Sequence, residues 1–248
     1  MSTIKTCRIL GVNIAVTNMA QTVQYIENNL EELRGKYICV SNVHTTIMAH
    51  DNPAYRNVQN SAAIALPDGK PLSVVSRKRG YTEAERVTGP DLMGELFARK
   101  NGLKHFFYGD KEETLQILQQ KLKEKYPDIQ IAGMISPPFR SLSQEEEKAY
   151  IQQINDSGAD IVWIGLGAPK QENWMYEHQG MLHGVMIGVG AGFSYHAGLI
   201  KRAPKWMQKM SLEWFYRLMQ DPVRLFKRYF TTNLKFMLLE AKDKGEAL

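Results

Sequence analysis

Apolar residues in the first two-thirds of the chain alternate between short unbroken runs and stretches with a helical period. The unbroken runs predict strands at residues 8–16, 37–41, 62–66, 104–108, 129–134, 161–165 and 185–189. The stretches between them predict helices at 19–33, 45–60 with an interruption near Pro53, 72–79, 91–101, 112–126, 143–155 and 171–179. This alternation predicts an α/β fold with a Rossmann-like, doubly wound and mainly parallel sheet. Ligands of such sheets bind outside the carboxyl ends of the strands, so the loops that follow the strands are expected to hold the chemistry.

Beyond Phe193 the strand pattern stops, and helices are predicted at 204–219 and 223–241. We therefore predict an α/β core at residues 1–198 and a helical appendage at 199–248. The second helix of the appendage is amphipathic, with Leu225, Phe226, Tyr229, Phe230, Phe236 and Met237 on one side and Arg224, Arg228 and Lys235 on the other. A helix packed on the core with a solvated basic face and a helix that lies on a membrane fit this pattern equally well.

The charge distribution separates the appendage from the core. Residues 199–248 hold 11 Lys and Arg against 5 Asp and Glu, which leaves 20 basic and 21 acidic residues in the first 198 of the 248. The same segment holds eight of the 24 aromatic residues. A basic, aromatic segment on a neutral body indicates an anionic surface or an anionic ligand. The two cysteines give no disulfide framework or zinc spacing, and no signal peptide or membrane span is predicted, which favours a cytoplasmic location.

The run Leu66-Pro67-Asp68-Gly69 follows a predicted strand and forms a tight-turn signal. Asp68 either only shapes this turn or presents a carboxylate at the end of the strand, where it could take a proton from an acceptor hydroxyl. Two further loops suit phosphate groups. In the run 164–174, a glycine turn leads into a helix start with Lys170 and Gln171, without Walker spacing. In the run 85–91, Arg86 suits a diphosphate and Asp91 suits a helix cap.

The run 188–193 begins like a dinucleotide-binding fingerprint, but Phe193 stands in place of the last glycine. It is weak evidence for NAD, although Gly190 would let a ligand approach the backbone. No Asp-x-Asp pair occurs in the chain, so a metal-binding pair on a nucleotide diphosphate is not predicted. Arginines, lysines and backbone dipoles would then have to meet the charge of a leaving group.

The order and spacing of these motifs resemble the WecG/TagA/CpsF glycosyltransferases, also called glycosyltransferase family 26, from about Ile9 to Tyr229. The matching pieces are Ser41-Asn42, Leu66-Pro67-Asp68-Gly69, Arg86-Val87-Thr88-Gly89, the run from Gly165 to Glu172, Gly188-Val189-Gly190, Arg202-Ala203-Pro204, the run from Glu213 to Leu218, and the run from Asp221 to Leu225. Each piece is common alone, whereas the whole series is specific.

The resemblance implies an inverting enzyme without a metal or other cofactor. It implies transfer of N-acetylmannosamine or a related sugar from UDP to an undecaprenyl-diphosphate-linked acceptor, such as GlcNAc-diphosphoundecaprenol, for teichoic acid, common antigen or capsule synthesis. Asp68 matches the proposed general base. The substrate site is predicted to contain Asn42, Arg86, Thr88, Lys170, Gln171 and Gly190, completed by Arg217, Arg224 and Arg228 of the appendage. The appendage is expected to close the site and to dock on the anionic inner face of the cell membrane, and self-association is compatible with the family.

One position departs from the family pattern. Many members have an aspartate after the phenylalanine that corresponds to Phe193, and here Ser194 takes that place. The chain is therefore expected to lack a carboxylate for donor hydroxyls, and another UDP-hexose is an alternative donor. Two other classes stay open from the residues alone. The glycine run suggests a nicotinamide-dependent oxidoreductase, and the basic tail suggests a nucleic-acid-binding module, for which a neutral α/β body is an unusual platform.

Overall fold

The computed structural model of the chain describes residues 4–204, 206, 207, 210 and 212–243, without the side chains of residues 224, 225 and 227–229. Its centre is an eight-stranded sheet in the order β1-β2-β4-β3-β8-β7-β5-β6. The strands are β1 Thr6–Ile9, β2 Val12–Ala15, β3 Tyr37–Ser41, β4 Ile64–Pro67, β5 Lys104–Gly109, β6 Gln130–Ile135, β7 Ile161–Gly165 and β8 Val185–Gly188. Every neighbouring pair is parallel except β1 and β2. The predicted α/β, Rossmann-like fold is confirmed.

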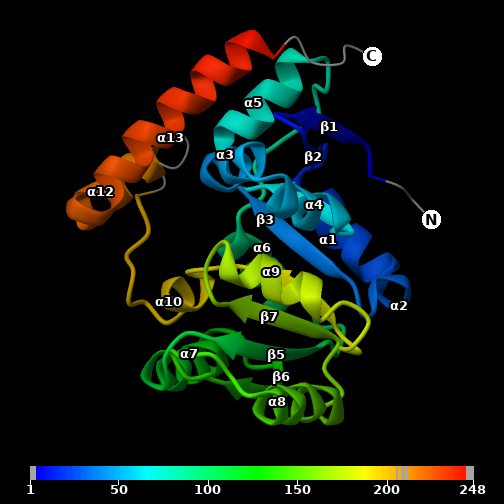
Figure 1. Ribbon diagram of the computed structural model, residues 1–248. Coiled ribbons are helices and arrows are strands. Elements are labelled where there is room, and N and C mark those ends of the chain that lie inside the picture. Colours follow the sequence, from blue (N-terminus) through cyan, green and yellow to red (C-terminus); the bar gives the residue numbers. More distant parts are fainter. Residues whose placement is uncertain (1–3, 205, 208–209, 211, 244–248) are drawn as a thin grey trace.

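Helices cover both faces of this sheet (Figure 1). They are α1 Met19–Asn28, α2 Leu30–Leu33, α3 Val43–Asp51, α4 Pro53–Ser61, α5 Lys70–Lys78, α6 Gly89–Phe97, α7 Glu112–Lys125, α8 Gln144–Asp156, α9 Lys170–Glu177, α10 Gly192–His196, α12 Glu213–Gln220 and α13 Pro222–Lys242. One hydrophobic core cluster contains residues of α3, α4, α5, α8, α9 and α13, and the other contains residues of α1, α2, α6, α7 and α10. Alternate residues of β3 enter the two clusters, with Cys39 in the first and Val40 in the second, as expected for a strand buried on both sides.

Three predicted elements were wrong in detail. The single strand at 8–16 is a β-hairpin, because Leu10 and Gly11 take φ values of 46° and 88° and turn the chain back on itself. The helix at 19–33 breaks at Asn29 into α1 and α2. The helix at 204–219 is not continuous over the described residues, because Met210 lies in a turn and α12 begins only at Glu213. Residues 205, 208, 209 and 211 of this prediction lie outside the described part of the chain.

The second half of α13 is fixed to the core. Phe236 is 4% exposed and belongs to the first core cluster. Lys235 forms an ion pair with Asp51 of α3 at 2.7 Å, and Glu240 accepts a hydrogen bond from Arg79 at 2.9 Å. The first half of α13 is different, because Phe226 and Phe230 are 61% and 63% exposed. The helix thus combines core packing at one end with an open aromatic surface at the other, next to α12 (Figure 1).

Candidate active site

Asp68 lies directly after β4, at the carboxyl edge of the sheet. Its backbone N–H donates to the carbonyl of Ser41 at the end of β3, 2.8 Å away, which fixes the turn between the two strand ends. Burial raises the pKa of Asp68 to about 6. Arg86 and Arg217 oppose this rise, whereas Glu213 and Asp91 add to it. The result is a half-buried carboxylate that is mainly ionised at neutral pH and more basic than an ordinary aspartate.

Asn42 stands beside this turn at the end of β3. Its Oδ1 accepts hydrogen bonds from the N–H groups of His44 and Thr45, so that it caps α3. A Cβ atom added to Gly69 would lie 3.8 Å from the Cα of Asn42, which puts Asn42 next to the Asp68 turn. The structure therefore brings two of the predicted site residues together from neighbouring strands.

Arg86 is joined to the appendage through Glu213, the first residue of α12. Its Nη1 donates to Glu213 Oε2 at 2.8 Å, and Glu213 Oε1 lies 3.5 Å from Nη2 of Arg202. Arg202 in turn donates to both carboxylate oxygens of Asp91. Although burial pushes the pKa of Asp91 up, the hydrogen bonds from Arg202 and Thr88 hold it below its ordinary value. This chain of charges links the predicted diphosphate-binding arginine to the helix that is expected to close the site.

Thr88 is buried and caps α6, and its Oγ1 donates to Asp91 Oδ2 at 2.6 Å. Its hydroxyl is therefore already engaged within the protein.

Arg217 of α12 lies over the ring of Tyr195, with its Cζ 5.8 Å from the ring centroid. It lies close enough to Asp68 to act on that carboxylate. The predicted roles of Arg224 and Arg228 concern side chains outside the described part of the chain.

Gln171 and Gly190 meet at the carboxyl edge of β8. Gln171 is 4% exposed, its Oε1 accepts from the Gly190 N–H at 2.9 Å, and its Nε2 donates to Glu172 Oε1 at 2.8 Å. Gly190 has a φ of 53°, in the left-handed region that favours glycine. Lys170, the first residue of α9, is exposed. Gln171 thus fixes the backbone of the glycine loop, whereas the side chain of Lys170 is open to solvent.

Asp110 is a residue that the sequence reasoning missed. It follows β5, and its Oδ2 accepts a hydrogen bond from the Ser194 hydroxyl at 2.9 Å. No acidic residue stands at position 194 itself, but the structure places the carboxylate of Asp110, from another strand, beside the Ser194 hydroxyl. The only signal in the sequence was its place, since Gly109-Asp110 stands at a strand-to-helix junction like the other candidate loops.

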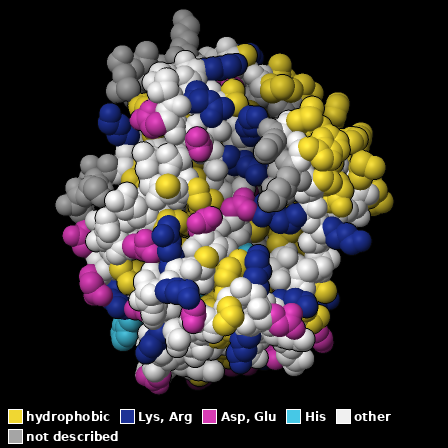
Figure 2. All heavy atoms as spheres, turned by 180° about the vertical axis from the view of Figure 1, so that it is seen from behind, with side chains coloured by type: hydrophobic (Ala, Val, Ile, Leu, Met, Phe, Trp, Pro, Cys, Tyr) yellow, Lys and Arg dark blue, Asp and Glu magenta, His cyan; other side chains and the backbone are white. Residues whose placement is uncertain are grey.

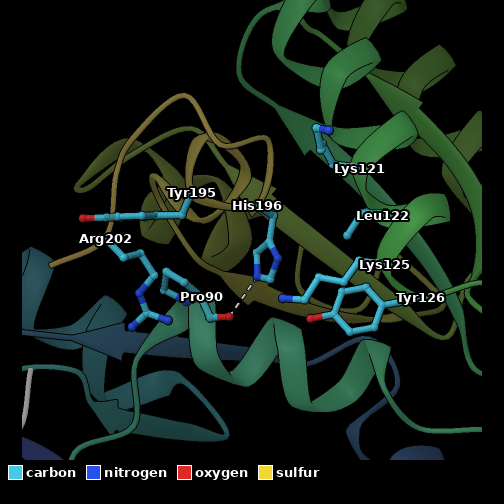
Figure 3. A pocket seen from close by; sticks show the side chains of 8 residues that line it. All are labelled: Pro90, Lys121, Leu122, Lys125, Tyr126, Tyr195, His196 and Arg202. Atoms are coloured by element: carbon cyan, nitrogen blue, oxygen red, sulfur yellow. Dashed lines mark hydrogen bonds between the residues drawn. The ribbon is translucent and has the colours of Figure 1, made fainter. Parts of the chain in front are cut away.

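A pocket lies between α6, α7 and α10, next to the ion pair of Arg202 and Asp91. Arg202 and Pro90 are among the residues that line it (Figure 3). Lys121 and Lys125 approach it from α7, and His196 Nε2 donates a hydrogen bond to the Pro90 carbonyl at 2.9 Å. Burial lowers the pKa of His196, so its ring is neutral at pH 7. Arg202 and the two lysines give this side of the site a positive character.

Two features bear on metal binding and membrane insertion within residues 4–204, 206, 207, 210 and 212–243. No group of three or more His, Cys, Asp and Glu side chains within that part of the chain could hold a metal ion. Within the same residues, no helix has both the length and the apolar character that crossing a bilayer requires.

Residues 7–247 match the model of a family described as the glycosyl transferase WecG/TagA/CpsF family. A Bacillus subtilis protein is 30% identical over 84% of this chain and 81% of its own length. Proteins of Bacillus spizizenii and Staphylococcus aureus are each 29% identical, over 91% and 95% of this chain and 90% and 93% of their own. All three are named N-acetylglucosaminyldiphosphoundecaprenol N-acetyl-beta-D-mannosaminyltransferase.

Proposed function

The chain belongs to the WecG/TagA/CpsF family of glycosyl transferases, and we propose that it moves N-acetylmannosamine from UDP to GlcNAc-diphosphoundecaprenol. A closely related UDP-hexose is the second candidate donor, because Ser194 departs from the family pattern. The observation that carries the proposal is Asp68, a carboxylate of raised pKa at the carboxyl edge of the sheet, flanked by Arg86 and Arg217. A base can take the proton of the attacking hydroxyl, and cations can stabilise the leaving diphosphate, so both groups assist glycosyl transfer from a nucleotide diphosphate.

In the proposed reaction, a hydroxyl of the acceptor sugar attacks C1 of the donor sugar. The new C1–O bond forms on the face opposite the breaking bond to UDP, so the configuration at C1 inverts. Asp68 takes the proton of the attacking hydroxyl as the bond forms. The negative charge that gathers on the UDP oxygen is met by Arg86 and Arg217, helped by Lys170. The expected contributions of Arg224 and Arg228 fall on side chains outside the described residues.

We propose further that the enzyme needs no metal ion, because Arg86 and Arg217 can supply the positive charge that a divalent cation would otherwise bring to the diphosphate. Arg86 is 26% exposed and is held by Glu213 rather than by solvent alone. A guanidinium fixed in this way can offer two parallel hydrogen bonds to phosphate oxygens.

The membrane side of the proposal rests on the surface of the appendage. Exposed apolar side chains gather over α12, the first half of α13 and the residues before them, at the upper right of Figure 2. They are Trp206, Met210, Trp214, Phe215, Met219, Val223, Phe226 and Phe230. A contiguous apolar patch of this kind, in the most basic part of the chain, fits peripheral attachment to the anionic inner face of the cell membrane. The lipid-linked acceptor would then meet the site from the membrane.

The test is transfer of labelled N-acetylmannosamine from its UDP derivative to a short-chain lipid diphosphate of GlcNAc, with and without EDTA. We expect a disaccharide with a β-linkage and an unchanged rate in EDTA. A product of retained configuration would contradict the single displacement. A rate abolished by EDTA and restored by magnesium would contradict the metal-independent mechanism.

A further inference from the structure

The backbone of Asp110 is fixed on several sides at the carboxyl end of β5. Its N–H donates to the Gly165 carbonyl at 3.2 Å, and its carbonyl accepts from the Ser136 hydroxyl at 2.8 Å. Its φ is 58°, in the left-handed region that few residues other than glycine adopt, although aspartate and asparagine tolerate it better than most. The loop therefore holds this carboxylate in a defined place beside the end of β7 and the start of α10.

The carboxylate itself has hydrogen-bonding capacity to spare. Oδ1 accepts from the N–H of Lys111 at 2.8 Å, and Oδ2 accepts from the hydroxyl of Ser194 at 2.9 Å. Two carboxylate oxygens offer about four acceptor sites, so about half remain for a ligand. Asp110 is half-buried, and in the described portion of the chain no lysine, arginine or histidine forms a salt bridge with it.

The charges along the carboxyl edge divide the site into two ends. Arg86 acts on Asp68 at the end of β4, whereas Arg217 acts on Asp68 from a place over the ring of Tyr195, between the two ends. Asp110 stands at the end of β5, and β3, β8 and β7 lie between these two strands in the sheet. A carboxylate repels a diphosphate and attracts hydroxyl groups, so the diphosphate belongs with the arginines. The part of the nucleotide that carries hydroxyl groups then belongs with Asp110.

We propose that Asp110, oriented by Ser194, accepts hydrogen bonds from the vicinal hydroxyls of the ribose of the nucleotide donor. The inference rests on the nucleotide-sugar chemistry proposed above and names the residue that reads its ribose. Carboxylates at the strand ends of nucleotide-binding α/β sheets bind ribose hydroxyls in the same way. The hydroxyl of Ser194 fixes the orientation of the carboxylate at the end of β5.

The experiment compares the binding of UDP and 2′,3′-dideoxy-UDP by calorimetry, because the second ligand lacks only the two ribose hydroxyls. We expect the wild-type protein to bind UDP about 10- to 100-fold more tightly, as hydrogen bonds to a charged group predict. Asp110→Asn tolerates the same backbone conformation and should lose most of this preference. Ser194→Ala, which removes only the orienting hydroxyl, should lose part of it and gives a second measurement if the first variant is unstable.

Glu113→Gln is the matched control, because it removes one exposed carboxylate from the first turn of α7 without touching Asp110. It should keep the full preference for UDP. The exchange Asp110→Ser with Ser194→Asp should regain part of the preference that Asp110→Ser loses. An unchanged preference in Asp110→Asn would overturn the inference. Weaker binding of a UDP-sugar with unchanged binding of UDP would also overturn it, in favour of the transferred sugar.

The same titrations separate this inference from the proposed function. If the wild-type protein binds neither UDP nor a UDP-sugar, the proposed function fails and the role of Asp110 fails with it. If it binds UDP tightly but shows no preference over the dideoxy ligand, only the role of Asp110 fails.

Discussion

Asp68 combines two properties that conflict, since it must be ionised to accept a proton yet lies where an ionised group is disfavoured. Burial raises its pKa to about 6, and Arg86 and Arg217 keep the rise from being larger. A base with this pKa is mostly ionised at pH 7.5 and still binds a proton well, which suits general base catalysis near neutral pH. Holding the ionised carboxylate in this place lowers the free energy of unfolding of the protein at neutral pH.

Asp68→Asn should therefore stabilise the protein at pH 7.5. An unfolded aspartate has a pKa of about 3.9, which is lower than the folded value, so the folded wild type loses stability as pH rises from about 4 through 6. Asparagine has no such loss. Thermal melting at pH 4 and pH 7.5 should show a gain that grows with pH, by about 2–4 °C for each kcal/mol. A gain of equal size at both pH values would show that Asp68 has an ordinary pKa.

Glu172 is a buried acid, 1% exposed, that holds Gln171 and through it the N–H of Gly190. Burial raises its pKa, which favours the neutral form. Glu172→Gln should keep both the fold and the glycine loop, with a change in unfolding free energy below about 1 kcal/mol. Glu172→Ala should cost about 2–4 kcal/mol, because it leaves a cavity and an unpaired amide. Chemical denaturation of the two variants tests this difference, and equal losses would contradict a role of Glu172 in holding Gln171.

Single residues could be predicted from the sequence only where local pattern marks them. Asp68 follows an apolar strand in a Pro-Asp-Gly turn, and both signals are local. Asp110 also follows an apolar strand but lacks the Pro-Asp-Gly turn, and its partner Ser194 is 84 positions away and becomes a neighbour only when β5 and α10 pack together. The buried position of Gln171 was also hidden, since a helix start reads the same whether it faces a ligand or a glycine loop.

At the scale of elements, α12 has the most direct link to the candidate site, because its first residue, Glu213, forms an ion pair with Arg86. Glu213 joins Arg86 at 2.8 Å and raises the pKa of Asp68 through its negative charge. The helix α12 thus acts on the carboxylate of Asp68 through the charge of Glu213. The start of this helix was predicted wrongly. The apolar periodicity continues through Met210, which lies in a turn, whereas α12 begins only at Glu213.

Glu213→Gln should lower the pH at which kcat/KM reaches half its maximum, which for the wild type should lie near the Asp68 value of about 6. Removing a nearby negative charge makes it easier for Asp68 to ionise. Arg86→Gln should move the midpoint in the opposite direction, because it removes the largest charge that favours ionisation. The pH dependence of kcat/KM for both variants is the measurement. Midpoints that move together in one direction would mean that these charges do not act on the base.

On the scale of the whole molecule, the fold class could be predicted, because the alternation of strand and helix patterns extends over most of the chain. The excess of basic and aromatic residues near the carboxyl terminus is visible in the sequence itself. The division of α13 could not. Its amphipathic pattern is continuous, yet Phe236 is buried against the core while Phe226 and Phe230 are open to solvent. Cutting the chain after Phe193 would therefore expose core surface, so substitutions on the exposed half are the cleaner test of membrane docking.

Phe226→Ser with Phe230→Ser should weaken binding to anionic vesicles about tenfold or more, because each ring contributes apolar area to the contact. Melting temperature and activity on a water-soluble acceptor analogue should be unchanged, since both rings lie outside the core. Phe139→Ser is the matched control, because Phe139 is 81% exposed on the surface of the α/β region, outside the appendage. Vesicle sedimentation measures the binding. Equal loss in both variants would place the contact elsewhere.

The most direct test of the central claim is acceptor-dependent release of UDP by the wild type and Asp68→Asn, measured with a GlcNAc diphosphate lipid and a panel of UDP-sugars in EDTA. We expect release from one donor of the panel by the wild type. For Asp68→Asn we expect turnover reduced by about 10²–10⁴-fold, with UDP binding retained. Equal turnover of the two proteins would contradict the role of Asp68. Release by neither protein with any donor would contradict the proposed reaction.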